Sequence, residues 1–332
     1  MDPVDWLLDS DSDPAIRWQS LRDLTDATAA AIATERARVP REGLGAAILS
    51  HQQPDGSWRR GGAPTWLTTL FTLQLLRSTA VDPTDPAVSK ALALPEFNLC
   101  WDCTPGNWDL RTVTDAGNPF FQGEEEPCIN GGVLAFGSYF GHPNQKLARR
   151  LVSEQLPDGG WNCDAPKSQR SSFHTTICAL EGLLEYERSI TESSFGENQA
   201  RPQVHANEIT AARHRAEEYL LDRNLFRRKS TGEVANVEFL QLAFPPRYHY
   251  DVLRALDYFR AANAKPDPRM SEAVDLIESK RQPDGRWPLE NSYTEALALP
   301  LTETVGQPSR WNTLRALRVL RWFNSANPQK SS

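Results

Sequence analysis

A five-residue turn occurs three times in the chain and constrains its fold more than any other feature. The pattern is P-D-G-x-W, at residues 54–58, 157–161 and 283–287. Proline sets φ for a turn, aspartate bonds to its own backbone, glycine accepts a positive φ, and tryptophan supplies a large apolar anchor. Each copy follows one apolar-periodic stretch and precedes another. The copies therefore indicate repeated helix–turn–helix units that bury their faces by stacking.

Six segments share one apolar register, and we expect each to form an inner helix. They begin at Trp18, Leu67, Cys128, His174, Tyr250 and Trp311. More polar helical patterns lie before and between them, at residues 4–8, 43–52, 87–94, 144–155, 208–225 and 270–282. No stretch has strand alternation long enough to compete. Six inner and six outer helices predict an all-α chain closed into an (α/α)6 toroid. We expect a single domain over residues 1–332, with its core at about 14–324.

Composition narrows the class of protein. The net charge of -7 argues against nucleic acid as the main partner. No apolar run approaches the ~20 residues that a membrane span needs. Five cysteines, an odd number, follow an acidic N-terminus and indicate reduced thiols. We therefore expect a cytoplasmic protein with a small-molecule substrate, and the sequence leaves its oligomeric state open.

Three long connections place the expected site at one rim. They cover residues 98–127, 160–173 and 291–309, and each leads from an outer helix into an inner one. They therefore gather where the inner helices begin. Long ordered loops at one end of a barrel commonly carry function.

A zinc site is predicted at this rim. Cys128 and His174 hold equivalent first-turn positions on consecutive inner helices, and Cys163 lies in the loop before His174. Thiolate and imidazole suit Zn²⁺, and an open fourth position is typical of catalytic sites. Water, Cys103 or Glu126 would complete the coordination. The alternative is that both cysteines are small buried apolar residues and that His174 is a helix cap.

The same rim carries candidate substrate-binding residues. Converging helix N-termini favour an anion, and Arg247 and Arg310 would bind a diphosphate or carboxylate bidentately. Arg310 alternatively pairs with a rim carboxylate such as Glu303. The aromatic residues Trp18, Trp66 and Trp311 would line the cavity, or they belong to the core.

A catalytic group is predicted at the start of the fifth inner helix, at His249, Tyr250 and Asp251. Asp251 would act as a general base near the mouth, or it would only complement the helix dipole. The Cys100–Cys103 C-x-x-C motif has no second C-x-x-C to pair with, and Cys178 fits the apolar pattern of a core residue.

The turns, followed by inner helices such as residues 173–180, resemble the prenyltransferase and squalene–hopene cyclase repeat. The resemblance covers most of residues 14–324 and is closest to stand-alone bacterial proteins. It implies an α/α toroid and a terpene-cyclase- or prenyltransferase-like, metal-dependent enzyme. Its substrate would be a small hydrophobic or isoprenoid-like molecule at the toroid mouth. Protein prenyltransferases bind zinc through Asp, Cys and His, and Glu126, Cys128 and His174 match these positions, with Glu in place of Asp.

Two departures keep other functions open. The D-x-D-D motif of class II terpene cyclases is missing from the sequence, and no α-subunit for protein prenylation is evident. One alternative is zinc-dependent thiol chemistry of the lanthipeptide-cyclase kind, which also uses two cysteines and a histidine. Another is a non-catalytic ligand-binding or scaffold toroid.

Overall fold

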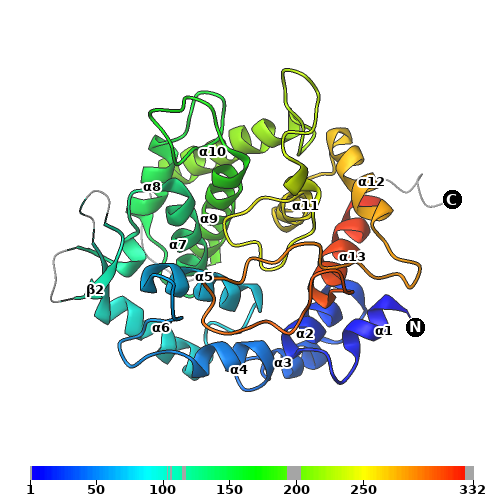
Figure 1. Cartoon of the computed structure of the whole chain (residues 1–332), viewed down its shortest axis with the longest axis horizontal. Helices are drawn as coiled ribbons and strands as arrows, with labels where there is room; N and C mark the ends of the chain where they lie inside the picture. Colours follow the sequence, from blue (N-terminus) through cyan, green and yellow to red (C-terminus); the bar gives the residue numbers. More distant parts are fainter. Residues whose placement is uncertain (1, 103, 105–106, 114–116, 193–202, 326–332) are drawn as a thin grey trace.

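Helices make up most of the structure. The computed structural model describes residues 2–102, 104, 107–113, 117–192 and 203–325. The helices that follow the six predicted inner segments are α2 (Pro14–Leu24), α5 (Thr65–Ser78), α7 (Pro127–Tyr139), α9 (Phe173–Glu192), α11 (Val252–Ala261) and α13 (Arg310–Ser325). The predicted outer helices are α1 (Pro3–Leu8), α4 (Gly43–Ser50), α6 (Pro86–Asn98), α8 (Gln145–Ser153), α10 (Gln203–Leu221) and α12 (Ser271–Ser279). Figure 1 shows the first set nearer the centre and the second set outside it. The predicted helical class is confirmed.

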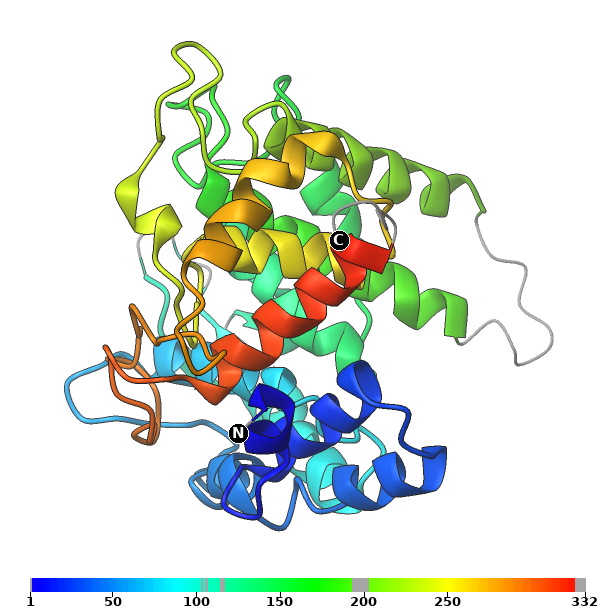
Figure 2. The ribbon, with the colours of Figure 1, turned by 90° about the vertical axis from the view of Figure 1, so that its right-hand side faces the viewer.

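The inner helices are neighbours in chain order. Helix α7 packs on α5 and α9, α13 packs on α11, and α13 also packs on α2. Side chains connect the remaining neighbours. Gln19 of α2 donates to the Ser78 carbonyl at the end of α5 over 3.2 Å, and Arg254 of α11 pairs with Glu181 of α9. Figure 2 shows α13 lying between α12 and the N-terminal helices.

The three P-D-G-x-W turns have identical hydrogen bonds. The indole N–H of Trp58, Trp161 and Trp287 donates to a carbonyl ten residues earlier, on the preceding outer helix, over 2.8, 2.6 and 2.7 Å. Each tryptophan backbone N–H donates to a threonine hydroxyl on the next inner helix. All three indoles are fully buried. The turns therefore fasten α4 to α5, α8 to α9 and α12 to α13.

Two glycines let α7 and α9 approach closely. A Cβ atom on Gly131 would lie 2.4 Å from the Cys178 carbonyl oxygen, and one on Gly182 would lie 2.5 Å from the Gly131 carbonyl oxygen. No larger residue fits at either position without moving a backbone. This contact fixes the start of α7, and with it Cys128, beside the loop that precedes α9.

Several elements differ from the sequence prediction. Helix α11 begins at Val252 with Asp251 as its N-cap, so Tyr250 precedes the helix. Helix α2 begins at Pro14, before Trp18, because the Asp13 side chain caps it there. The sequence did not predict α3 (Ala29–Arg36) or the 3-10 helices η1 (Phe120–Gln122), η3 (Val237–Leu240) and η4 (Pro268–Met270). It also missed an antiparallel sheet of order β2-β1-β3, formed by β1 (Leu99–Trp101), β2 (Leu110–Thr112) and β3 (Asn118–Pro119).

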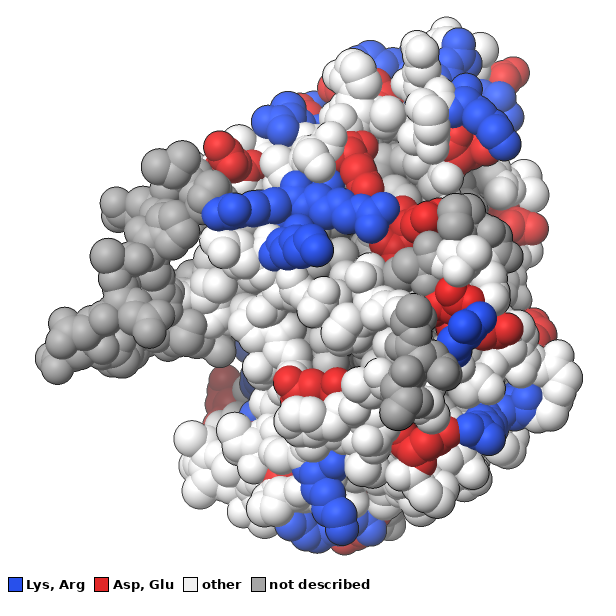
Figure 3. All heavy atoms as spheres, turned by 90° about the vertical axis from the view of Figure 1, so that its left-hand side faces the viewer, with Lys and Arg blue, Asp and Glu red and all other residues white. Residues whose placement is uncertain are grey.

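The outside of the molecule carries charges of both signs. On the face in Figure 3, basic and acidic side chains are interspersed, with one basic row in the upper half. Among the described helices, none combines the length and the apolar character that a membrane crossing requires.

Candidate functional site

A cavity of about 290 Å³ lies among the six inner helices. Its volume is at the lower end of the ~300–1,000 Å³ that small-molecule pockets usually enclose. Besides the helices, residues 244–247 form part of its wall. They belong to the connection between α10 and α11, which the sequence prediction of long functional loops left out.

Arginine dominates the charged wall of this cavity. In the described part of the chain, the lining arginines are Arg22, Arg77, Arg188, Arg247, Arg254, Arg260, Arg315 and Arg318. The lining carboxylates are Glu181, Glu185 and Asp257. Asp23 and Glu295 pair with these arginines from outside the wall, and Asp251 interacts electrostatically with Arg315. Eight lining guanidinium groups are therefore matched by three lining carboxyl groups and by three that lie outside the wall. Because guanidinium stays protonated, the cavity has a surplus of at least two positive charges.

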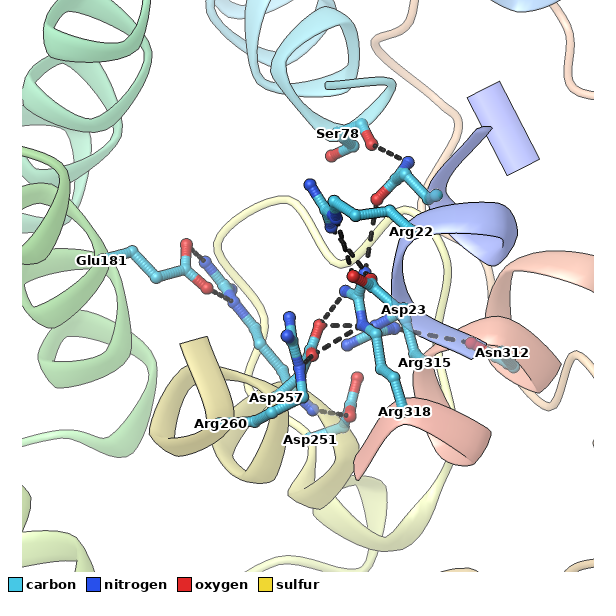
Figure 4. A network of polar contacts seen from close by, with 12 residues as sticks. Arg22, Asp23, Ser78, Glu181, Asp251, Asp257, Arg260, Asn312, Arg315 and Arg318 are labelled. Atoms are coloured by element: carbon cyan, nitrogen blue, oxygen red, sulfur yellow. Dashed lines mark hydrogen bonds and ion pairs between the residues drawn. The ribbon is translucent and has the colours of Figure 1, made fainter. Parts of the chain in front are cut away.

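Asp257 is the centre of the polar network in Figure 4. Its Oδ1 accepts from Arg260 Nε and from Arg318 Nε, each over 2.8 Å, and Arg315 lies 3.8 Å from Oδ2. Burial alone would raise the pKa of Asp257, but Arg318 and Arg260 beside it hold that pKa well below its usual range. Asp257 thus interacts with three guanidinium groups, of which that of Arg315 is buried and those of Arg260 and Arg318 are half-buried.

Two further arginines form close pairs across the cavity wall. Arg254 binds both carboxylate oxygens of Glu181 over 2.8 Å, which joins α11 to α9. Arg77 donates to Glu185 over 2.6 Å and joins α5 to α9. The Arg77 Nε has no hydrogen-bond partner among the described residues.

Arg188 and Arg247 are lining arginines whose carboxylate partners are either more distant or exposed. Arg188 donates to the Ala261 carbonyl and lies 3.7 Å from Glu185, and burial together with the neighbouring Arg77 lowers its pKa. Arg247 has a left-handed φ of 51° and pairs with Glu295, whose side chain is 73% exposed. Burial lowers the pKa of Arg247, and its Nε has no partner in the described structure.

The predicted substrate-binding residues lie in three different parts of the structure: the central cavity, a second pocket, and positions outside both. Arg247 and Trp311 line the central cavity, and Trp311 stacks on Phe244 at 4.3 Å. Arg310 lies in a second, peripheral pocket, where its guanidinium pairs with Asp11 over 2.6 Å. Glu303, its expected partner, instead accepts from the Arg310 backbone N–H.

Trp18 and Trp66 do not line either pocket. Trp18 is buried and its indole donates to the Thr79 carbonyl over 3.1 Å, so it belongs to the core. Trp66 is half-buried and packs against Trp101 at 6.1 Å between ring centroids.

The predicted catalytic residues lie outside the cavity lining. Asp251 is buried, burial raises its pKa, and its Oδ1 caps α11 by accepting from the Arg254 N–H. Tyr250 is buried and donates its hydroxyl to the Leu225 carbonyl. His249 stacks on Tyr293 at 3.5 Å, and burial with nearby His174 and Arg247 lowers its pKa to about 4. The contacts of Asp251 and Tyr250 are structural, and general-base action by Asp251 stays a prediction.

A carboxylate and two thiols converge at the start of α7. The candidate ligand atoms of Glu126, Cys128 and Cys163 all lie within 4.8 Å of one another. Cys128 donates to Glu126 over 3.6 Å, and Cys163 lies 3.4 Å from the Thr175 hydroxyl. A hydrogen bond from Cys128 lowers the pKa of the Cys163 thiol, and the same contact raises the pKa of Cys128. Two thiols and a carboxylate, all half-buried, are a donor set that fits Zn²⁺.

His174 does not belong to this group in the structure. Its Nδ1 accepts from the Tyr250 backbone N–H over 2.8 Å, and its ring packs against Phe239 and His249. The structure therefore brings together two of the three predicted zinc ligands and adds Glu126, which was expected only as a fourth. Cys103, the other suggested fourth ligand, lies outside the described residues.

The arginine-lined cavity was missed by sequence reasoning, although a signal for it exists. Arg22, Arg77, Arg188, Arg260 and Arg318 all lie in the second half of an inner helix. A charged residue on a helix expected to face the interior needs a partner there.

Comparisons with known proteins do not establish a family. No protein-family model matches the chain, and no curated protein matches it either. Among solved structures, a protein from Actinoplanes has 13% identity and a TM-score of 0.45, over 93% of this chain and 88% of that one. A variant of the type II terpene cyclase MstE from Scytonema, in complex with geranylgeranyl dihydroxybenzoate, has 15% identity and a TM-score of 0.41, over 94% of this chain and 87% of that one. TM-scores below 0.5 leave the likeness without weight for fold or function.

Proposed function

We propose that the chain is a terpene-cyclase- or prenyltransferase-like enzyme on an (α/α)6 toroid, and that its substrate is an isoprenoid-like molecule with an anionic head group. The observation that carries this proposal is the surplus of arginine charge in the central cavity. The neighbour relations of the inner helices, with α13 packed on α2, support the toroid. The repeated P-D-G-x-W turns support the resemblance to the family.

Arg188 and Arg247 are the residues that we assign to the anionic head. Both line the cavity: Arg188 lies 3.7 Å from Glu185, which Arg77 already binds, and Glu295, the partner of Arg247, is largely exposed. A guanidinium offers parallel N–H donors that match diphosphate or carboxylate oxygens. These charges would also stabilise negative charge that develops on a leaving group. The apolar part of the substrate would contact wall residues such as Leu75, Leu184 and Leu314.

Calorimetric titration with inorganic diphosphate tests the head-group site. We expect binding to the parent protein that weakens as salt rises, because charges attract the ligand. Arg188→Gln and Arg247→Gln should each weaken binding by about tenfold to a hundredfold, the range of a hydrogen bond to a charged group. Arg170→Gln is the matched control, since Arg170 is exposed and outside both pockets.

Absence of diphosphate binding by the folded parent protein would count against the proposal. So would equal weakening by all three substitutions, because the effect would then follow from net charge alone.

Zinc bound by Glu126, Cys128 and Cys163 is a second candidate feature, favoured by the convergence of their ligand atoms. A zinc ion held there would activate a water or thiol at its open position. The chain itself would supply the two thiolates and the carboxylate, and Thr175 would orient Cys163.

Elemental analysis of protein purified without chelator tests the metal site. We expect about one zinc per chain, lost in Cys128→Ser and Cys163→Ser. Cys178→Ser should retain it, because Cys178 is buried against Arg254. His174→Ala separates the two possible ligand sets, since zinc is retained if Glu126 is the third ligand. A metal-free, folded parent protein would exclude the site.

A further inference from the structure

Two half-buried cysteines lie next to each other at the start of α7. Of the four cysteines in the described part of the chain, Cys100 and Cys178 are buried, whereas Cys128 and Cys163 are half-buried. The sulfur atoms of Cys128 and Cys163 lie within 4.8 Å of each other. Because a disulfide bond is about 2 Å long, the two sulfurs need to approach by less than about 3 Å to form one.

The backbone holds this pair close to the surface. Cys128 lies in the first turn of α7, and the contact between Gly131 and Gly182 fixes α7 against α9. Cys163 lies in the connection that leads from the second P-D-G-x-W turn to α9. Residues 164–167, which follow it directly, are all exposed. The pair is therefore within reach of a small solute.

The contacts of the two thiols differ. Cys128 donates to a carboxylate oxygen of Glu126 over 3.6 Å, so its proton has an acceptor close by. The Thr175 hydroxyl lies 3.4 Å from the Cys163 sulfur and is able to donate to a thiolate there. The thiolate is the form of cysteine that attacks an oxidant. This arrangement favours Cys163 as the attacking sulfur and Cys128 as the sulfur that completes a disulfide.

We propose that Cys128 and Cys163 form a reversible oxidation site for a hydroperoxide such as hydrogen peroxide. The Cys163 thiolate attacks one peroxide oxygen, so that an S–O bond forms and the O–O bond breaks. The hydroxide that leaves takes up the proton that Cys163 has lost. Cys128 then attacks the sulfur of the Cys163 sulfenic acid, the S–S bond forms, and the S–O bond breaks. The second hydroxide leaves as water with the Cys128 proton, so two thiols are oxidised and the peroxide is reduced to water.

Oxidation of the pair would also control the metal site, and this part of the inference rests on the zinc proposed above. Zinc binds thiolates, and a disulfide has none to offer. Of the three converging donors, only Glu126 is then left. The reduced pair therefore holds zinc, and the oxidised pair releases it.

Thiol counting on chelator-treated protein tests the disulfide without zinc. The reduced chain has five thiols, and one equivalent of hydrogen peroxide should lower the count by two. Peptide mapping should then recover Cys128 and Cys163 as one cross-linked pair, and dithiothreitol should restore the original count. Loss of thiols without this cross-link overturns the inference, and the parent protein alone decides that outcome.

Single substitutions test the two roles. Cys128→Ser removes the second thiol, so dimedone should trap a sulfenic acid at Cys163. Cys163→Ser should give neither a disulfide nor an adduct at Cys128. Cys178→Ser is the matched control, and its rate of disulfide formation should stay within about twofold of the parent, because a buried cysteine is inert. An adduct at Cys128, or an equal loss of rate in the control, contradicts the assignment.

Zinc and the disulfide are measured separately, so the two proposals can fail independently. In zinc-loaded protein, peroxide should release the metal to a chromogenic chelator as the disulfide forms. Zinc that stays bound after the disulfide has formed contradicts the exchange. A parent protein that forms the disulfide but binds no zinc overturns the metal site alone. A parent protein that binds zinc through Cys128 and Cys163 and forms no disulfide overturns the present inference alone.

Discussion

Trp161 is one of three tryptophans that occupy equivalent positions in the repeated turns. It is fully buried, and its indole N–H donates to Leu151 while its backbone N–H donates to Thr176. Trp58 and Trp287 have the same contacts in their own repeats. Three equivalent positions cannot all be one active site, so the tryptophans are structural.

Trp161→Ala should therefore lower the free energy of unfolding by about 3–5 kcal/mol, as loss of a large buried aromatic does. Denaturant titration followed by circular dichroism measures the change. Trp108→Ala is the control, because Trp108 is half-buried and lies outside the three turns. A Trp161→Ala protein that unfolds like the parent would contradict the structural assignment.

His249 should make stability depend on pH in the mildly acidic range. Its folded-state pKa of about 4 lies below the ordinary 6.5, so the unfolded chain binds the proton more readily. The stability that neutral His249 contributes is present above pH ~6.5 and is lost as pH falls towards ~4. Melting temperatures of the parent and of His249→Asn, measured across this window, should converge at low pH. Parallel curves would show that His249 does not titrate there.

At this scale the sequence predicted some site residues and not others. It identified Arg247 and Trp311, which line the cavity, and Cys128 and Cys163, which meet. It could not tell that His174 would accept from the Tyr250 N–H, since this contact joins residues far apart in sequence. Side-chain direction within a helix turn depends on such tertiary partners, and apolar spacing does not encode it.

At the scale of elements, each turn joins an outer helix to the next inner helix through a threonine. Thr69, Thr176 and Thr313 accept from the turn tryptophans over 3.0, 3.1 and 3.0 Å. All three threonines are fully buried. An unsatisfied N–H at this position would have no access to water.

Thr176→Val should cost about 1–3 kcal/mol, the range for leaving a buried donor unpaired. Valine keeps the shape of the side chain, so the loss would report the hydrogen bond itself. Thr191→Val on the same helix is the control, because Thr191 is exposed and should change stability by less than about 0.5 kcal/mol. Equal effects of the two substitutions would contradict a role for the Thr176–Trp161 bond.

The helices were predictable because their apolar period repeats, and the small sheet was not. Strand β1 has three residues, all buried, and β2 has three, two of them exposed. Neither strand is long enough to show the alternation of apolar and polar residues by which a strand is predicted from sequence. Helix α3 has no buried residue, so the spacing that identifies a core-facing helix is absent from its sequence.

At the scale of the whole molecule, the charge balance of the arginine network affects the stability of the fold and the binding of an anion in opposite directions. Asp257 compensates Arg260, Arg315 and Arg318 in the interior. Removing this one negative charge takes away the nearest carboxylate partner of all three guanidinium groups, which destabilises the fold. The same change increases the positive surplus that would attract an anion.

Asp257→Asn should therefore lower the free energy of unfolding by about 3–5 kcal/mol and bind inorganic diphosphate more tightly than the parent. Thermal unfolding with and without diphosphate measures both, because a ligand that binds only the folded state raises the melting temperature. Asp164→Asn, at an exposed loop position, is the control for the change in net charge. Weaker diphosphate binding by Asp257→Asn would contradict the charge-surplus argument.

The packing of α13 on α2 has a consequence for how the chain is made. Contacts such as Arg318 with Gln19 and Arg310 with Asp11 join residues 299 positions apart. During synthesis, the buried face of α2 leaves the ribosome long before its partner exists. Such distant pairing slows folding and exposes apolar surface meanwhile. Nascent chains that stop short of α13 should thus be the species that chaperones bind and proteases cut.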